Sequence, residues 1–150
     1  MKLADAVKAA KRVFICGNGG SAANAIHIAN DLVSVGIKAQ ALTGDVATLT
    51  AIANDFGYEH VFSRQIAVLG EAGDLLIALS GSGRSPNIIA ALNAARAKGM
   101  VTWAIVGRER DTPAALAADK SLANGDDMQD AEQAQLYLGH KIMRLIRDGG

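Results

Sequence analysis

Short runs of consecutive apolar residues alternate along this chain with longer segments in which apolar residues recur every three or four positions. The first pattern is typical of strands that are buried on both faces, and the second of amphipathic helices. Their alternation predicts a parallel sheet flanked by helices. The expected strands are Val13–Cys16, Lys38–Leu42, Leu75–Leu79, Val101–Val106 and a weaker edge strand at Lys120–Ala123.

The intervening segments carry ordinary helix signals. Ser85-Pro86 and Thr112-Pro113 are N-cap and first-turn pairs, and Gly99 stands where a helix end tolerates a positive φ. The sequence therefore predicts an α/β fold, a three-layer, doubly wound parallel sheet of about five strands with ligands at the carboxyl ends of its strands. The expected helices are Ser21–Val35, Ala47–Ala53, Tyr58–Leu69, Pro86–Lys98 and Gln129–Arg147.

Length and charge narrow the class of protein. The 150 residues suit a single domain over 1–150, and 15 basic residues balance 15 acidic ones. Without a basic run we expect neither a nucleic acid partner nor a membrane surface, and no apolar stretch reaches the ~20 residues of a membrane helix. The single cysteine, Cys16, excludes an intramolecular disulfide and favours a reducing, cytoplasmic location.

Two loops follow expected strands and precede expected helices. In Cys16-Gly17-Asn18-Gly19-Gly20-Ser21 the glycines permit a tight turn, and the helix amides behind them favour an anion. This loop is neither a dinucleotide fingerprint, because Ala22 holds the sixth position, nor a P-loop, because no Gly-Lys-Ser/Thr follows. A turn that merely connects strand and helix remains the alternative.

The second loop, Ser80-Gly81-Ser82-Gly83-Arg84-Ser85-Pro86, has three hydroxyls and two glycines before a helix start. Such a loop suits a phosphate monoester, because serine hydroxyls donate to phosphate oxygens beside a helix N-terminus. A solvated turn is the alternative. Two such loops at neighbouring strand ends favour phosphate binding.

Taken in order, these motifs resemble those of the sugar isomerase (SIS) domain family, of the phosphoheptose isomerase type. The resemblance covers almost the whole chain and implies a sugar phosphate ligand. It further implies a homo-oligomer, a dimer or a tetramer, with sites at subunit interfaces. It is carried by both loops, by His27, by Asn54-Asp55-Phe56-Gly57 and by Phe62-Ser63-Arg64.

The resemblance assigns the substrate contacts residue by residue. It implies that Ser80, Ser82 and Ser85 hold the phosphate, whereas Gly81 stands where the family usually has threonine. Family members also carry a longer N-terminal helix that builds a tetramer core, so we expect altered assembly here. The remaining substrate-binding residues that it implies are Asn18, Gly19, Gly20, Ser21, Asp55 and Glu132.

A zinc site is implied as well, with His27, Asp31, Glu132 and His140 as ligands. His27 and Asp31 lie four residues apart and share a helix face, although an ordinary helix pair would look the same. Asp31 replaces a family glutamate, and Glu132 stands where the family has a metal-binding glutamine, with Gln133 as its rival. Eight residues of helix span about 12 Å, so Glu132 joins His140 at one metal only if it lies at or before the helix start.

The implied reaction is an aldose–ketose isomerisation of sedoheptulose 7-phosphate to D-glycero-D-manno-heptose 7-phosphate through an enediol(ate), toward a lipopolysaccharide precursor. Asp31 would be the base and His140 the acid. A zinc ion would polarise the carbonyl. The alternatives are an isomerase for another sugar phosphate and a non-catalytic SIS module. Such a module would be a sugar phosphate sensor or a protein-binding adaptor, such as a replication-initiator-associating protein.

Overall fold

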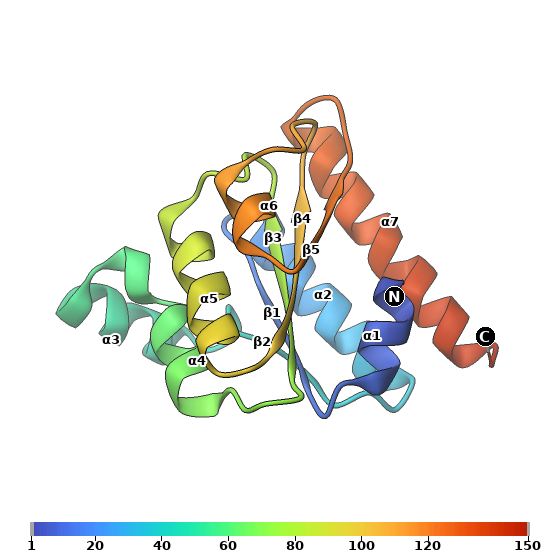
Figure 1. The fold of residues 1–150 in the computed structure, drawn as a ribbon, viewed down its shortest axis with the longest axis horizontal. Helices are drawn as coiled ribbons and strands as arrows, with labels where there is room; N and C mark the ends of the chain where they lie inside the picture. Colours follow the sequence, from blue (N-terminus) through green and yellow to red (C-terminus); the bar gives the residue numbers. More distant parts are fainter. Residues whose placement is uncertain (1, 150) are drawn as a thin grey trace.

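The computed structural model describes residues 2–149, which form one five-stranded sheet between two layers of helices (Figure 1). The strand order is β2-β1-β3-β4-β5 and all pairs are parallel. The order reverses between β1 and β3, where doubly wound sheets bind ligands. The predicted architecture is therefore confirmed. The strands are β1 (Val13–Cys16), β2 (Ala39–Ala41), β3 (Leu75–Ser80), β4 (Val101–Val106) and β5 (Lys120–Ala123).

The helices differ from expectation in two places. The segment Tyr58–Leu69 is not one helix, because Val61 and Phe62 turn into the core at its middle and are almost fully buried. The sequence analysis also did not predict α1, whose roughly two turns bury Leu3 and Val7. The helices are α1 (Leu3–Ala9), α2 (Gly20–Ser34), α3 (Val46–Phe56), the 3₁₀ helix η1 (Tyr58–His60), α4 (Ser63–Leu69), α5 (Pro86–Ala97), α6 (Pro113–Ala117) and α7 (Met128–Arg147).

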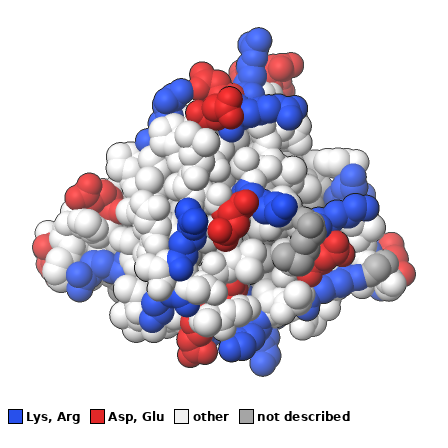
Figure 2. Space-filling view, in the orientation of Figure 1, with Lys and Arg blue, Asp and Glu red and all other residues white. Residues whose placement is uncertain are grey.

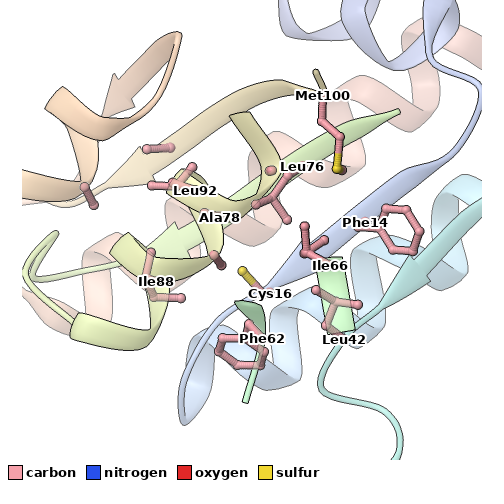
Figure 3. Close-up of a cluster of buried hydrophobic side chains, with 14 of the residues drawn as sticks. Phe14, Cys16, Leu42, Phe62, Ile66, Leu76, Ala78, Ile88, Leu92 and Met100 are labelled. Carbon is pink, nitrogen blue, oxygen red and sulfur yellow. The ribbon is translucent and has the colours of Figure 1, made fainter. Parts of the chain in front are cut away.

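The three central strands β1, β3 and β4 bury both of their faces, which explains their unbroken apolar sequences, whereas the edge strands β2 and β5 are partly or largely exposed. Phe14 and Cys16 point to the side covered by α4, α5 and α6, where they belong to the buried cluster shown in Figure 3. Val13 and Ile15 point to the other side, which α1, α2 and α7 cover. Cys16 is fully buried, and this burial raises the pKa of its thiol to about 12. On the second side α7 packs along α2 (Figure 1), which brings the end of the chain back to its beginning.

Helix α3 lies largely outside the core. This helix projects from the body (Figure 1), and none of its residues is buried. On the face seen in Figure 2, basic and acidic side chains are interspersed. Among residues 2–149 no helix is both long enough and apolar enough to span a membrane.

Candidate active site

The two polar loops lie side by side because β1 and β3 are hydrogen-bonded neighbours. The glycine-rich loop leads from β1 into α2, and the serine-rich loop leads from β3 into α5. Gly19 caps α2 with a φ of 55°, a left-handed conformation that favours glycine. A Cβ added at Gly20, the next residue, would meet the carboxylate of Glu132, so this side chain would have to shift. Gly19 is thus required by its backbone conformation, and Gly20 lets Glu132 lie close to the loop.

A small cavity of ≈ 100 Å³ opens between these loops and the start of α7. Ser80 Oγ accepts the Gly83 amide at 3.0 Å and Ser82 Oγ accepts the Arg84 amide at 3.2 Å, so both hydroxyl hydrogens are available to a ligand. Ser85 precedes α5 without capping it through its side chain. The cavity is lined by Asn18, Ser21, Leu79, Ser80, Gly81, Ser82, Ser85, Met128 and Glu132. Larger hollows of ≈ 400 and ≈ 640 Å³ lie beside β2, away from both loops.

Three of the four expected metal ligands meet where α2 and α7 pack together. The Nε2 atoms of His27 and His140 are 3.1 Å apart, and Oδ2 of Asp31 lies 3.4 Å from each of them. This oxygen is buried without a hydrogen-bond partner. Two ligands bound to tetrahedral zinc at about 2.0–2.1 Å are themselves about 3.3 Å apart. The donor set and its spacing therefore fit a divalent transition metal.

Glu132 is not part of this cluster. Among the described residues the group of ligand atoms consists of His27, Asp31 and His140. Because α7 already begins at Met128, Glu132 lies inside the helix, two turns before His140, and its carboxylate lies against Gly20 at the phosphate cavity. The rival residue Gln133 is exposed. The spacing condition for a four-residue site is therefore not met.

Gln135 ties α7 to the start of α2 beside the cavity, and the sequence analysis did not single it out. It is 2% exposed, and its Oε1 accepts hydrogen bonds from Ser21 Oγ and Asn24 Nδ2, both at 3.1 Å. Asn24 Nδ2 also donates to the Glu132 carbonyl at 2.8 Å. The sequence does carry a signal for the burial of Gln135. It lies four residues from both Ala131 and Gly139, and residues at this spacing share one face of a helix.

Asp55 is the predicted substrate residue that lies apart from both groups. It is exposed near the end of α3, where it accepts a hydrogen bond from Asn54 Nδ2 at 2.9 Å. It lines neither the cavity between the two loops nor the group formed by His27, Asp31 and His140. Its separation follows from the outward projection of α3.

Comparisons with known proteins agree with this arrangement. Residues 1–107 match the SIS domain family. The phosphoheptose isomerase of Sulfurimonas denitrificans is 42% identical over 142 residues, which cover 91% of this chain and 73% of that protein. The phosphoheptose isomerase of Bradyrhizobium sp. strain BTAi1 is 40% identical over 151 residues, covering 97% and 76%.

Solved structures give the same assignment. Phosphoheptose isomerase GmhA from Neisseria gonorrhoeae superposes with a TM-score of 0.87 at 36% identity, covering 97% of this chain and 81% of that one. A phosphoheptose isomerase from Francisella tularensis gives a TM-score of 0.90 at 30% identity, covering 97% and 83%. With 73% or more of the length of each of these relatives matched, the chain belongs to the SIS domain family and, within it, groups with the phosphoheptose isomerases.

Proposed function

We propose that this protein is an aldose–ketose isomerase that converts sedoheptulose 7-phosphate to D-glycero-D-manno-heptose 7-phosphate through an enediol(ate). The observation that carries the proposal is the pairing of two groups on the same two helices. The first group is the hydroxyl-lined cavity, which the amino-terminal ends of α2 and α7 border. The second group is His27, Asp31 and His140, which meet further along the same two helices. A binding module for the phosphate alone would not need the second group.

The serine-rich loop is the proposed phosphate site. Ser80, Ser82 and Ser85 supply hydroxyls, and the amino terminus of α5 adds its dipole. Asn18 and Ser21 line the same cavity from the glycine-rich loop, where Gly19 and Gly20 let the backbone approach. Binding energy from this remote group holds the reacting carbons in place.

The spacing of the two groups favours a long-chain sugar. The step from Ser21 to His27 along α2 is about 9 Å, and the step from Glu132 to His140 along α7 is about 12 Å. A substrate that spans the two groups therefore carries its phosphate several carbons away from its carbonyl. This supports a heptose phosphate over a triose phosphate.

Asp31 and His140 divide the proton transfers in this proposal. Asp31 removes a proton from carbon 1 of the ketose, and the bonding electrons form the carbon–carbon double bond of the enediol(ate). A proton from His140 then reaches carbon 2, while the hydroxyl on carbon 1 passes its proton to the oxygen on carbon 2 and becomes the new carbonyl; proton exchange with solvent returns Asp31 to its carboxylate and His140 to its protonated form. Because Oδ2 of Asp31 and Nε2 of His140 face the metal position, the proton transfers in this proposal use the other oxygen of Asp31 and Nδ1 of His140.

The fitting metal is zinc, held by His27, Asp31 and His140. Two imidazoles and one carboxylate are three protein ligands, the number that leaves a catalytic zinc one open position. When bound, zinc polarises the substrate carbonyl and stabilises the negative charge that develops on its oxygen. Asp55 and Glu132 are assigned to the sugar chain, Glu132 because its carboxylate borders the phosphate cavity on the side of α7.

We further propose a cytoplasmic homo-oligomer, a dimer or a tetramer, with the sites at subunit interfaces. His27 is half-exposed, and the apolar residues Ile26 and Tyr137 are 48% and 65% exposed on the same two helices. A second subunit on this face would bury them and close the metal cluster to water. Light scattering of the purified protein tests this part, since a monomer in the active fraction would contradict it.

The decisive experiment is turnover of sedoheptulose 7-phosphate by the purified chain, with and without added zinc, with aldose product as the readout. Zinc-dependent product formation supports the isomerase. A zinc-loaded protein that binds inorganic phosphate and forms no product would instead favour the sensor or adaptor. Pentose and hexose ketose phosphates, run in parallel, distinguish an isomerase of different substrate length.

A further inference from the structure

Asn18 is the centre of a hydrogen-bonded group that joins three separate segments. Its Nδ2 donates to Asn87 Oδ1 at 2.9 Å, and Asn87 Nδ2 donates back to Asn18 Oδ1 at 2.8 Å. The hydroxyl of Tyr58 donates to the same Asn18 oxygen at 2.9 Å. We call Asn18, Asn87 and Tyr58 the amide node.

The node is built into the interior on one side and open to solvent on the other. Asn87 is 2% exposed, whereas Tyr58 is 60% exposed. A buried amide without partners is costly, so the side chain of Asn87 depends on Asn18 for its two hydrogen bonds. Tyr58 can leave the node without exposing any core.

Each member comes from a segment to which a substrate role is assigned. Asn18 lies in the glycine-rich loop, and Asn87 is the second residue of α5, just after Ser85 of the serine-rich loop. Tyr58 begins η1, directly after the end of α3 that carries Asp55. The node therefore connects the two halves of the phosphate cradle to the segment proposed to contact the sugar chain.

We propose that the amide node positions the site, in two separable ways. The Asn18–Asn87 pair fixes the distance between the two loops and so sets the affinity for phosphate. The Tyr58 hydroxyl ties the Asp55 segment to this cradle and so aligns the sugar chain. The Tyr58 part rests on the proposed isomerase function, whereas the Asn87 part requires phosphate binding only.

The node also restricts what Asn18 can offer a ligand. Both lone-pair positions of its carbonyl oxygen are occupied, by Asn87 and by Tyr58. One of its two amide hydrogens is used as well. Asn18 therefore contacts a phosphate as a donor, through its second amide hydrogen, which matches the acceptor character of phosphate oxygens.

The first test is calorimetric titration of the full chain with inorganic phosphate, which needs no turnover. We expect Asn87→Ala to weaken phosphate binding about tenfold, the effect of losing one or two hydrogen bonds. Asn93→Ala, at an exposed position of the same helix, is the matched control and stays within twofold of wild type. Asn18→Ala combined with Asn87→Ala binds no more weakly than the worse single variant, because the two residues act as a pair.

The second test separates Tyr58 from the cradle. We expect Tyr58→Phe to leave phosphate affinity unchanged and to lower kcat/KM for sedoheptulose 7-phosphate about tenfold, with Ser121→Ala, which removes an exposed hydroxyl from β5, as control. Should Asn87→Ala not fold, Asn87→Ser, whose hydroxyl is too short to reach Asn18, replaces it.

Two results overturn the cradle role: phosphate affinity within twofold of wild type in the folded Asn87 variant, or no phosphate binding by the wild type. An unchanged kcat/KM in Tyr58→Phe overturns the alignment role. Absence of turnover in the wild type, with phosphate binding intact, contradicts the proposed isomerase function. The Asn87 test remains valid in that case, because it measures phosphate affinity only.

Discussion

His27 and His140 face each other through their Nε2 atoms at 3.1 Å, across the packed surfaces of α2 and α7. Their rings meet edge to face, with an interplanar angle of 70°. Oδ2 of Asp31 completes the triangle at 3.4 Å from both. Because His27 and Asp31 lie on α2 and His140 lies on α7, the geometry of the cluster depends on the packing of these two helices.

Zinc should bind this cluster and stabilise the fold. We expect added zinc to raise the Tm of chelator-treated protein, since a ligand that binds only the folded state stabilises it by mass action. His27→Ala should weaken zinc affinity by more than about 100-fold, beyond the usual cost of losing an outer partner. His60→Ala, which removes a histidine paired with Glu59 on the surface, should bind zinc like wild type. Equal zinc affinity in both variants would exclude the cluster as the site.

The carboxylate of Asp31 should be indispensable for turnover. Asp31→Asn keeps the shape but cannot accept the proton, so kcat should fall by about 10²–10⁴. The kcat of His140→Ala should fall by a similar factor, because this variant lacks the proposed acid. Inorganic phosphate affinity, measured by calorimetry, should stay within twofold of wild type in both variants. Turnover of Asp31→Asn near the wild-type rate would assign the base elsewhere.

Glu132 should oppose phosphate rather than bind metal. Its carboxylate borders the proposed phosphate cavity, where it repels an anion by at least about 1 kcal/mol, the energy of two unit charges about 4 Å apart in water. Glu132→Gln should therefore tighten inorganic phosphate binding about fivefold and leave zinc affinity unchanged. Gln133→Glu, which adds charge at an exposed neighbour, serves as the comparison. A large loss of zinc affinity in Glu132→Gln would restore the four-ligand site.

Gly81 and Gly107 should respond differently to an added methyl group. The Cβ of Ala at 81 would meet the sulfur of Met128, the far end of a flexible side chain that is 47% exposed. We expect Gly81→Ala to cost less than about 1 kcal/mol. The Cβ of Ala at 107 would meet the Gly81 carbonyl oxygen, which the backbone holds in place, so Gly107→Ala should cost about 1–3 kcal/mol. Urea denaturation of both variants compares the two costs.

Stability should fall at alkaline pH because of Cys16. In the unfolded chain this thiol loses its proton with a pKa of about 8.5, whereas burial in the folded state raises the pKa to about 12. Between these values the folded state holds one more proton, so the thiol lowers the free energy of unfolding by about 1.4 kcal/mol per pH unit. Urea denaturation between pH 8 and 10 should show a steeper loss in wild type than in Cys16→Ala. Parallel slopes would contradict this assignment.

The amino-acid sequence by itself determined the layers of this protein and the two loops that we expect to bind an anion. Unbroken apolar runs such as Val13–Cys16 predict strands buried on both faces, because local patterning records which faces are covered. Glycine and serine placed between strand and helix predict an anion site for equally local reasons. The resemblance to SIS domains then supplied roles that no spacing argument reaches.

Only the tertiary structure decided which of the candidate side chains meet. The proximity of Asp31 and His140 depends on how α7 packs along α2, and the exclusion of Glu132 depends on α7 beginning at Met128. The break at Phe62 and the pairing of Asn18 with Asn87 are likewise contacts between segments far apart in sequence. Helical and strand periods fix the face on which a residue lies, whereas the partner opposite that face is set by packing across the sheet and between helices.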